Sequence, residues 1–352
     1  MDQIIPMDQI RATREPHLAE KIVIVDGQGG CGKTMLSPII AALDRVELLT
    51  YAYEIEHLCA LNYLGRVQPD AASTMVRMLT DLKLYNIMQG REVNFRFSDL
   101  SSAFSDRLWK YIKRLFLKGD ESIPDKAAKE RPILHLTTHN LLGISEPVFE
   151  GLGQRVVMIE VVRHPLYRIK QQALNMERLI SDVRHFSIHY EYRGQELPYW
   201  ALGWEDLFFR SSPVEKAIYK MDCLDRLIEK TTETLSQKNN ALITIPFEIF
   251  VIDPWPYLSQ IELALGSKVT LYTRKVMKKQ KVPRKMYAEG ISLRIYKRCG
   301  WEPPKYSNEE DELAARRKYM AERTSKDALQ LLDTLCERYE ERFMGGRKHY
   351  KQ

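Results

Sequence analysis

The sequence predicts an α/β fold in which a central parallel sheet lies between two layers of helices. Two observations predict this class. A strand-like run at residues 22–25 leads into a glycine-rich loop and then into a helical pattern. Further apolar runs at residues 133–137, 156–162 and 241–246 alternate with amphipathic helical segments. Apolar strands that alternate with helices typically form a parallel sheet that is covered on both faces.

Composition places the chain among globular proteins. Its 352 residues allow a large core, and 44% hydrophobic and 28% charged residues are ordinary values. A net charge of +6 suits an anionic cofactor or acceptor and is too small to predict a nucleic-acid partner. The N-terminus lacks a signal-peptide pattern and no apolar run reaches membrane-span length, so we expect a cytoplasmic protein with no membrane segment. Five scattered cysteines predict reduced thiols and no zinc site.

We expect three parts along the chain. Residues 1–20 form a polar leader, residues 21–300 a single α/β domain, and residues 301–352 a charged helical extension. Within the domain, residues 53–118 show helical periodicity without a strong strand, which predicts a helical insertion after the second strand. The extension contains one predicted C-terminal helix, at about residues 308–343, that packs on the domain.

The glycine-rich loop carries the most specific pattern. Residues 27–34 fit G-x-x-x-x-G-K-[ST] between a strand and a helix, which is the context of a phosphate-binding loop. Glycines let backbone N–H groups turn toward an anion, and the helix dipole favours negative charge there. The candidate cofactor-binding residues of the loop are Gly27, Gly29, Gly30, Gly32, Lys33 and Thr34. The alternative is a glycine-rich turn that happens to end in Lys-Thr.

Two further strand ends carry candidate functional side chains. Arg163 follows the strand at 156–162, where its guanidinium can donate two hydrogen bonds to a phosphate; a salt bridge at a helix start is the alternative. His139 follows the strand at 133–137, where it can take a proton from an acceptor hydroxyl; an ordinary loop histidine is the alternative. His135 is a weaker candidate because it lies deeper in the same strand.

A late strand completes the pattern. The strand at 241–246 leads to Glu248, then to Asp253-Pro254 and to a helix that ends at Leu265-Gly266. Together with the phosphate loop, Thr138-His139 and Arg163-x-Pro165-x-x-Arg168, these segments resemble the sulfotransferase family. The resemblance covers roughly residues 21–51 and 133–266, and it implies a P-loop-type three-layer fold.

The resemblance also implies an activity and a set of roles. The cofactor would be 3′-phosphoadenylyl sulfate, and a sulfuryl group would pass to a hydroxyl or amine of a small-molecule or carbohydrate acceptor. His139 would be the base beside catalytic Lys33. The 3′-phosphate would be bound by Arg163, Gln171, Arg284 and Lys285. Two positions differ from the family pattern: Gly30 stands where the family has a basic residue, and Gln171 where it has a serine.

Other interpretations stay open. The basic segment 274–285, which closes over the 3′-phosphate in the family, also fits a solvated basic face. The phosphate loop ends in Gly-Lys-Thr, which also fits a kinase or NTPase that uses ATP with magnesium. In such an enzyme, Thr34 and a carboxylate at the end of a neighbouring strand would hold the magnesium ion. No apolar run ends in a convincing aspartate, which favours sulfuryl transfer and no metal site. A nucleotide-binding module without transfer chemistry is the third interpretation; the acceptor and the oligomeric state stay open.

Overall fold

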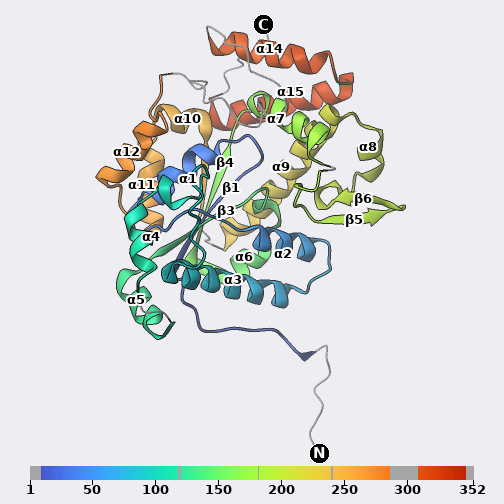
Figure 1. The fold of residues 1–352 in the computed structure, drawn as a ribbon. Coiled ribbons are helices and arrows are strands. Elements are labelled where there is room, and N and C mark those ends of the chain that lie inside the picture. Colours follow the sequence, from blue (N-terminus) through green and yellow to red (C-terminus); the bar gives the residue numbers. More distant parts are fainter. Residues whose placement is uncertain (1–8, 118–119, 181, 239–240, 286–307, 346–352) are drawn as a thin grey trace, which may run out of the picture.

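The structure is a computed structural model of the chain (Figure 1). It describes residues 9–117, 120–180, 182–238, 241–285 and 308–345. Cys299 lies outside the described residues, and the other four cysteines are free thiols.

A five-stranded sheet forms the centre of the molecule, in the order β2-β3-β1-β4-β7. All four neighbouring pairs are parallel. The strands are β1 (Lys21–Asp26), β2 (Thr50–Tyr51), β3 (Ile133–Thr137), β4 (Val156–Val162) and β7 (Ala241–Pro246). The predicted central parallel sheet is confirmed, and β1 lies in its middle, so the loop that follows β1 emerges between β3 and β4.

Helices cover both faces of the sheet (Figure 1). Side chains of a strand alternate between faces, and Ile22 and Ile24 belong to one core cluster while Val23 and Val25 belong to the other. One face is covered by α1 (Lys33–Ala41), α10 (Phe247–Ile252), α11 (Trp255–Leu265) and α12 (Leu271–Lys279). The other is covered by α2 (Tyr53–Tyr63), α3 (Pro69–Gln89), α6 (Glu146–Leu152), α7 (Pro165–Arg178) and α9 (Pro213–Gln237). The predicted three layers are therefore present.

The chain between β2 and β3 is helical, as expected. It contains α2, α3, α4 (Leu108–Arg114) and α5 (Ile123–Glu130). The segment between α7 and α9 contains a two-stranded antiparallel hairpin, β5 (His189–Tyr192) and β6 (Gln195–Pro198), followed by α8 (Glu205–Arg210). None of the described helices is long and apolar enough to cross a membrane.

The C-terminal region differs from the single helix that we expected. It forms two helices, α14 (Glu309–Ala321) and α15 (Lys326–Phe343). The Ser325 side chain accepts a hydrogen bond from the Ala328 N–H, which starts a new helix at this point. Leu332 and Leu335 of α15 are buried in the core cluster that also contains α7 and α9. The C-terminal helix thus packs on the α/β domain.

Candidate functional site

The loop after β1 has a backbone that two of its glycines make possible. Gly27 has a φ of +145°, and a Cβ atom there would lie 2.4 Å from the carbonyl oxygen of Val161. Gly32 has a φ of +110°, and a Cβ atom there would lie 2.2 Å from the Phe247 ring. A side chain at either position would clash and strain the backbone. The loop is therefore held close against both β4 and the segment that follows β7.

Lys33 and Thr34 begin α1 directly after this loop. Lys33 is buried, with 7% exposure, and its ammonium group donates a hydrogen bond to the carbonyl of Gly27. The Lys33 charge therefore lies over the loop rather than in solvent. Thr34 is exposed in the first helical turn. A cation beside the N-terminus of a helix favours the binding of an anion.

Arg163 extends from the end of β4 toward the same loop. Its guanidinium carbon lies 4.3 Å from the centre of the Phe247 ring, and its Nη1 donates to the Gly30 carbonyl at 3.3 Å. Its Nε lies 3.7 Å from the buried carboxylate of Glu248, too far for a hydrogen bond, and is buried without a hydrogen-bond partner among the described residues. Arg163 is thus oriented at the loop with hydrogen-bonding capacity left over.

Arg284 approaches Phe247 from a distant part of the chain. Its guanidinium carbon lies 5.5 Å from the ring centre, and its backbone N–H donates to the Val251 carbonyl at 2.6 Å. Two arginines therefore meet at one aromatic ring beside the loop. Lys285 follows at the surface and is exposed.

Helix α7 presents side-chain amides to the other side of the loop. Gln171 Oε1 lies 3.1 Å from where a Cβ atom of Gly30 would be, and it is buried without a hydrogen-bond partner among the described residues. Gln172 donates to the Gly29 carbonyl at 3.1 Å. Asn175 Oδ1 is also buried and unpaired within the described part of the chain. These two unpaired amide oxygens beside the glycine loop can accept hydrogen bonds from a polar ligand.

His139 lies at the same edge of the sheet as the loop. This follows from the fold, because β3 pairs in parallel with β1 and Thr137 is opposite Val25. The imidazole stacks on the Tyr53 ring, with centres 5.7 Å apart and planes 10° apart. The Tyr51 ring is also parallel to it, at 6.2 Å. These rings hold the orientation of the imidazole plane.

Glu56 of α2 completes the histidine site. Its Oε1 lies 3.2 Å from His139 Nδ1. Burial raises the pKa of Glu56 to about 8, and the charge of Asp26 adds to this rise. The His139 side chain is 39% exposed, and the surrounding protein removes part of its hydration. This desolvation and the charge of Lys33 lower the pKa of His139 to about 3. Near neutral pH, Glu56 is mainly protonated and His139 is neutral.

Asp26 connects the two strands on which the site is built. Its Oδ1 accepts a hydrogen bond from the Thr138 hydroxyl and its Oδ2 accepts one from the Leu142 N–H, both at 2.8 Å. Both carboxylate oxygens are therefore engaged in holding the loop that carries His139 against β1. No group of three His, Cys, Asp or Glu side chains in the described ranges is arranged to hold a metal ion.

Lys220 of α9 adds a further cation. Its ammonium nitrogen lies 4.8 Å from the centre of the buried Trp200 ring. The preceding Tyr199 hydroxyl donates to the Asn140 carbonyl at 3.4 Å, next to His139. Burial lowers the pKa of Lys220 to about 8, and the charge of Lys33 contributes to this decrease. Lys220 therefore belongs to the same electrostatic environment as Lys33 and His139.

The sequence pattern located some of this site and missed the rest. The loop, Arg163, Gln171 and Arg284 come together, and His139 lies at the edge that the loop occupies. His135 instead lies inside β3, opposite Val23, where burial lowers its pKa to about 3. Residues that the pattern did not reveal are Tyr51, Tyr53, Glu56, Gln172, Asn175, Lys220 and Phe247. None of these residues belongs to a sequence motif. Phe247 and Gln172 could have been suspected because each is next to an expected site residue, Glu248 and Gln171 respectively; the other five had no such signal.

Comparison with solved structures finds sulfotransferases. The sulfotransferase domain of the Synechococcus PCC 7002 olefin synthase is 12% identical, with a TM-score of 0.40, over 88% of this chain and 98% of that chain. Sulfotransferase STF9 of Mycobacterium avium is 13% identical, with a TM-score of 0.41, over 92% and 77%. Mouse sulfotransferase SULT7A1, complexed with PAP, is 12% identical, with a TM-score of 0.37, over 93% and 87%.

No protein-family model matches the chain, and no curated protein sequence does.

Proposed function

We propose that this chain transfers a sulfuryl group from 3′-phosphoadenylyl sulfate to a hydroxyl or amine of a small-molecule or carbohydrate acceptor. The observation that carries the proposal is the histidine site. His139 pairs with Glu56 at the sheet edge where Lys33 and the glycine loop lie, and the Lys33 charge acts on the imidazole. A candidate base thus faces a candidate phosphate site.

The residues present fit the proposed cofactor. Lys33 and backbone N–H groups of the glycine loop would hold the 5′-phosphate of the cofactor. The loop can adopt this conformation because Gly27 and Gly32, where a Cβ atom would clash, have none. Arg163 and Arg284 would bind the 3′-phosphate, and the amide N–H₂ of Gln171 would donate a hydrogen bond to it. When bound, the cofactor would supply an activated sulfuryl group on a phosphate leaving group. Lys33 and Lys220 would stabilise the negative charge that develops there.

The protonation of the His139–Glu56 pair controls whether His139 can act as a base. A protonated Glu56 donates to Nδ1, so the ring proton lies on Nε2 and this atom cannot accept another. An ionised Glu56 accepts from Nδ1–H, which leaves the Nε2 lone pair free. The carboxylate would then also stabilise the imidazolium that forms when Nε2 takes the acceptor's proton. The active form therefore requires the loss of one proton from the pair.

A kinase-like phosphoryl transfer is the second candidate, because the loop ends in Gly-Lys-Thr. Such a reaction normally needs magnesium held by the loop threonine and a carboxylate. Asp26 is the carboxylate at the end of β1, and both of its oxygens already accept hydrogen bonds. This arrangement favours sulfuryl transfer, for which His139 and the cations are the appropriate groups.

A nucleotide-binding experiment tests the proposal. Affinities of the purified chain would be measured calorimetrically for adenosine 3′,5′-bisphosphate, and for ATP with and without magnesium. Arg163→Ala should weaken bisphosphate binding by about 2 kcal/mol, or about 30-fold, because a charge-assisted contact is lost, and should affect ATP much less. Lys33→Ala should weaken both ligands. Arg178→Ala, at the exposed end of α7, is the matched control.

Each alternative has its own outcome. Equal weakening of both ligand classes by Arg163→Ala, together with magnesium-dependent ATP binding, would favour the kinase. Unchanged affinities in Lys33→Ala would remove the phosphate-loop assignment. Tight bisphosphate binding with no sulfuryl transfer to any member of an alcohol, phenol, sugar and amine panel would favour a binding module.

A further inference from the structure

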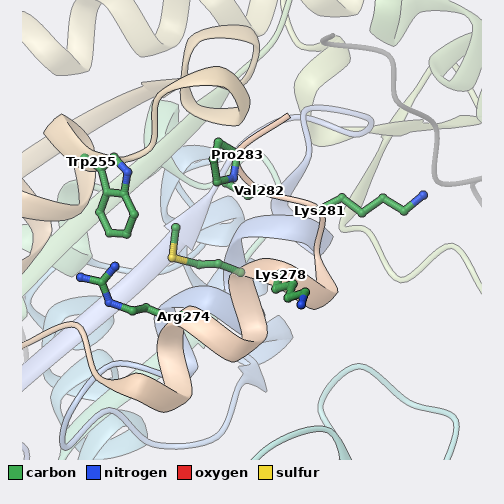
Figure 2. Close-up of a pocket in the computed structure, with 7 residues that line it drawn as sticks. Trp255, Arg274, Lys278, Lys281, Val282 and Pro283 are labelled. Carbon is green, nitrogen blue, oxygen red and sulfur yellow. The ribbon is translucent and has the colours of Figure 1, made fainter. Parts of the chain in front are cut away.

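A cavity of about 310 Å³ lies outside the site described above, between α11 and α12 (Figure 2). Trp255 lines one side of the cavity, and this residue is 40% exposed. Met277 and Val282 also line the cavity and are 2% and 4% exposed. Both belong to the core cluster on this face of the sheet, so the apolar base of the cavity is held by the fold.

Three basic residues are among those that line the cavity, and the Lys281 side chain extends away from Trp255 (Figure 2). Arg274 and Lys278 are four residues apart in α12, which places them on one side of the helix, and Lys281 follows the end of that helix. The Arg274 guanidinium carbon lies 4.8 Å from the centre of the Trp255 ring. Within the part of the chain that the structure describes, no carboxylate lies within 4.0 Å of these three groups. None of the three therefore forms a salt bridge within that part of the chain.

The cavity distinguishes two interpretations of the basic segment 274–285. A solvated basic face needs neither a hollow nor an exposed indole, because lysines on such a face extend into water. Here basic residues line an apolar hollow whose volume is at the lower end of the range for small-ligand pockets, about 300–1,000 Å³. An exposed indole with neighbouring cations is suited to a flat ring that carries a negative charge.

We propose that the cavity formed by Trp255, Met277, Val282, Arg274, Lys278 and Lys281 is a binding site for a small aromatic anion, such as an aryl sulfonate, sulfate or carboxylate. The ring packs against Trp255 and the apolar base, and the anionic group meets the cations of α12. The site is separate from the glycine loop, although its edge, Val282-Pro283, leads directly to Arg284 beside Phe247.

Calorimetric titration of the full chain with naphthalene-2-sulfonate tests the proposal. Naphthalene-2-sulfonamide is the matched neutral ligand, with the same ring and nearly the same shape. We expect the sulfonate to bind about tenfold or more tightly than the sulfonamide, because only the sulfonate forms charge-assisted contacts. The sulfonate affinity should also fall as salt concentration rises. Equal affinities for the two ligands would overturn the proposal.

Variants locate the site. The double variant Arg274→Ala/Lys278→Ala should lose at least about tenfold in sulfonate affinity, and Trp255→Ala should weaken both naphthalene ligands. Lys230→Ala, an exposed lysine on α9, should have no effect. Lys33→Ala should also leave sulfonate binding unchanged. Loss of sulfonate binding in Lys33→Ala but not in the double variant would show that the ligand binds at the glycine loop, and it would overturn the proposed site. Thermal unfolding of each variant verifies that it is folded.

Discussion

Glu47 and Glu56 lie just before and just after β2, and both are largely removed from solvent, yet their pKa values shift in opposite directions. Arg114 donates two hydrogen bonds to the Glu47 carboxylate, each at 2.9 Å, and Lys110 donates a third at 2.8 Å. Burial raises the pKa of Glu47, but the charges of Lys110 and Arg114 outweigh this effect and bring it to about 2.

Among the described residues, no lysine or arginine donates a hydrogen bond to Glu56. Its hydrogen-bonding contact is His139, whose own pKa is lowered, and Asp26 adds a like charge, so burial dominates and the pKa of Glu56 is about 8. The comparison distinguishes two uses of a buried carboxylate. Glu47 stays ionised and holds α4 to the sheet, whereas Glu56 changes its protonation near neutral pH, which is characteristic of functional sites.

Replacing Arg114 with Met should give the largest effect. The substitution leaves the Glu47 carboxylate buried without its main partner, so we expect a loss of about 3–5 kcal/mol in the free energy of unfolding. Chemical denaturation measures it, with Arg66→Met at an exposed site as the control. Adding Glu47→Gln to Arg114→Met should recover part of the loss. A loss below about 1 kcal/mol would mean that Glu47 is not held by this pair.

Replacing His139 with Ala should affect chemistry instead of stability. We expect turnover to fall by about a hundredfold or more, the usual scale for the loss of a positioned base, while bisphosphate nucleotide affinity stays nearly unchanged. Steady-state kinetics and calorimetry measure the two quantities. His17→Ala, at an exposed position before β1, is the control. Unchanged turnover would show that another group takes the acceptor's proton.

Replacing Glu56 with Gln should change the pH dependence of the reaction. In the unmodified chain, kcat should rise with pH through about 8, because the base-competent pair requires an ionised Glu56. Protonation of the His139 imidazole does not cause this rise in kcat, since the pKa of His139 is about 3. Gln does not titrate, so the rise near pH 8 should disappear in the variant. Glu54→Gln, on the same helix and exposed, should retain it. If kcat of Glu56→Gln still rises near pH 8, a different group must control this pH dependence.

Local sequence was sufficient for the parts of the site that depend on single strands. The loop between β1 and α1 was predictable because Gly27 and Gly32 adopt conformations that only glycine readily accepts, and these residues follow a buried apolar strand. His139 and Arg163 were predicted at the loop's edge because parallel strands end on the same side of a sheet. The helix α9 was predictable too, because its apolar residues recur at helical spacing. Its start is indicated by Pro213 in the first turn, which follows the N-cap Ser212.

The rest of the site comes from the order of the strands and from the path of the insertion, which no local pattern encodes. Placing β2 beside β3 brings Glu56 and the two tyrosines to His139, although they are far apart in sequence. Packing the segment after β7 against the loop brings Phe247 between Arg163 and Arg284. The shifted pKa values of Glu56 and His139 likewise depend on burial and on the nearby charges of Asp26 and Lys33, and both effects arise only when the chain is folded.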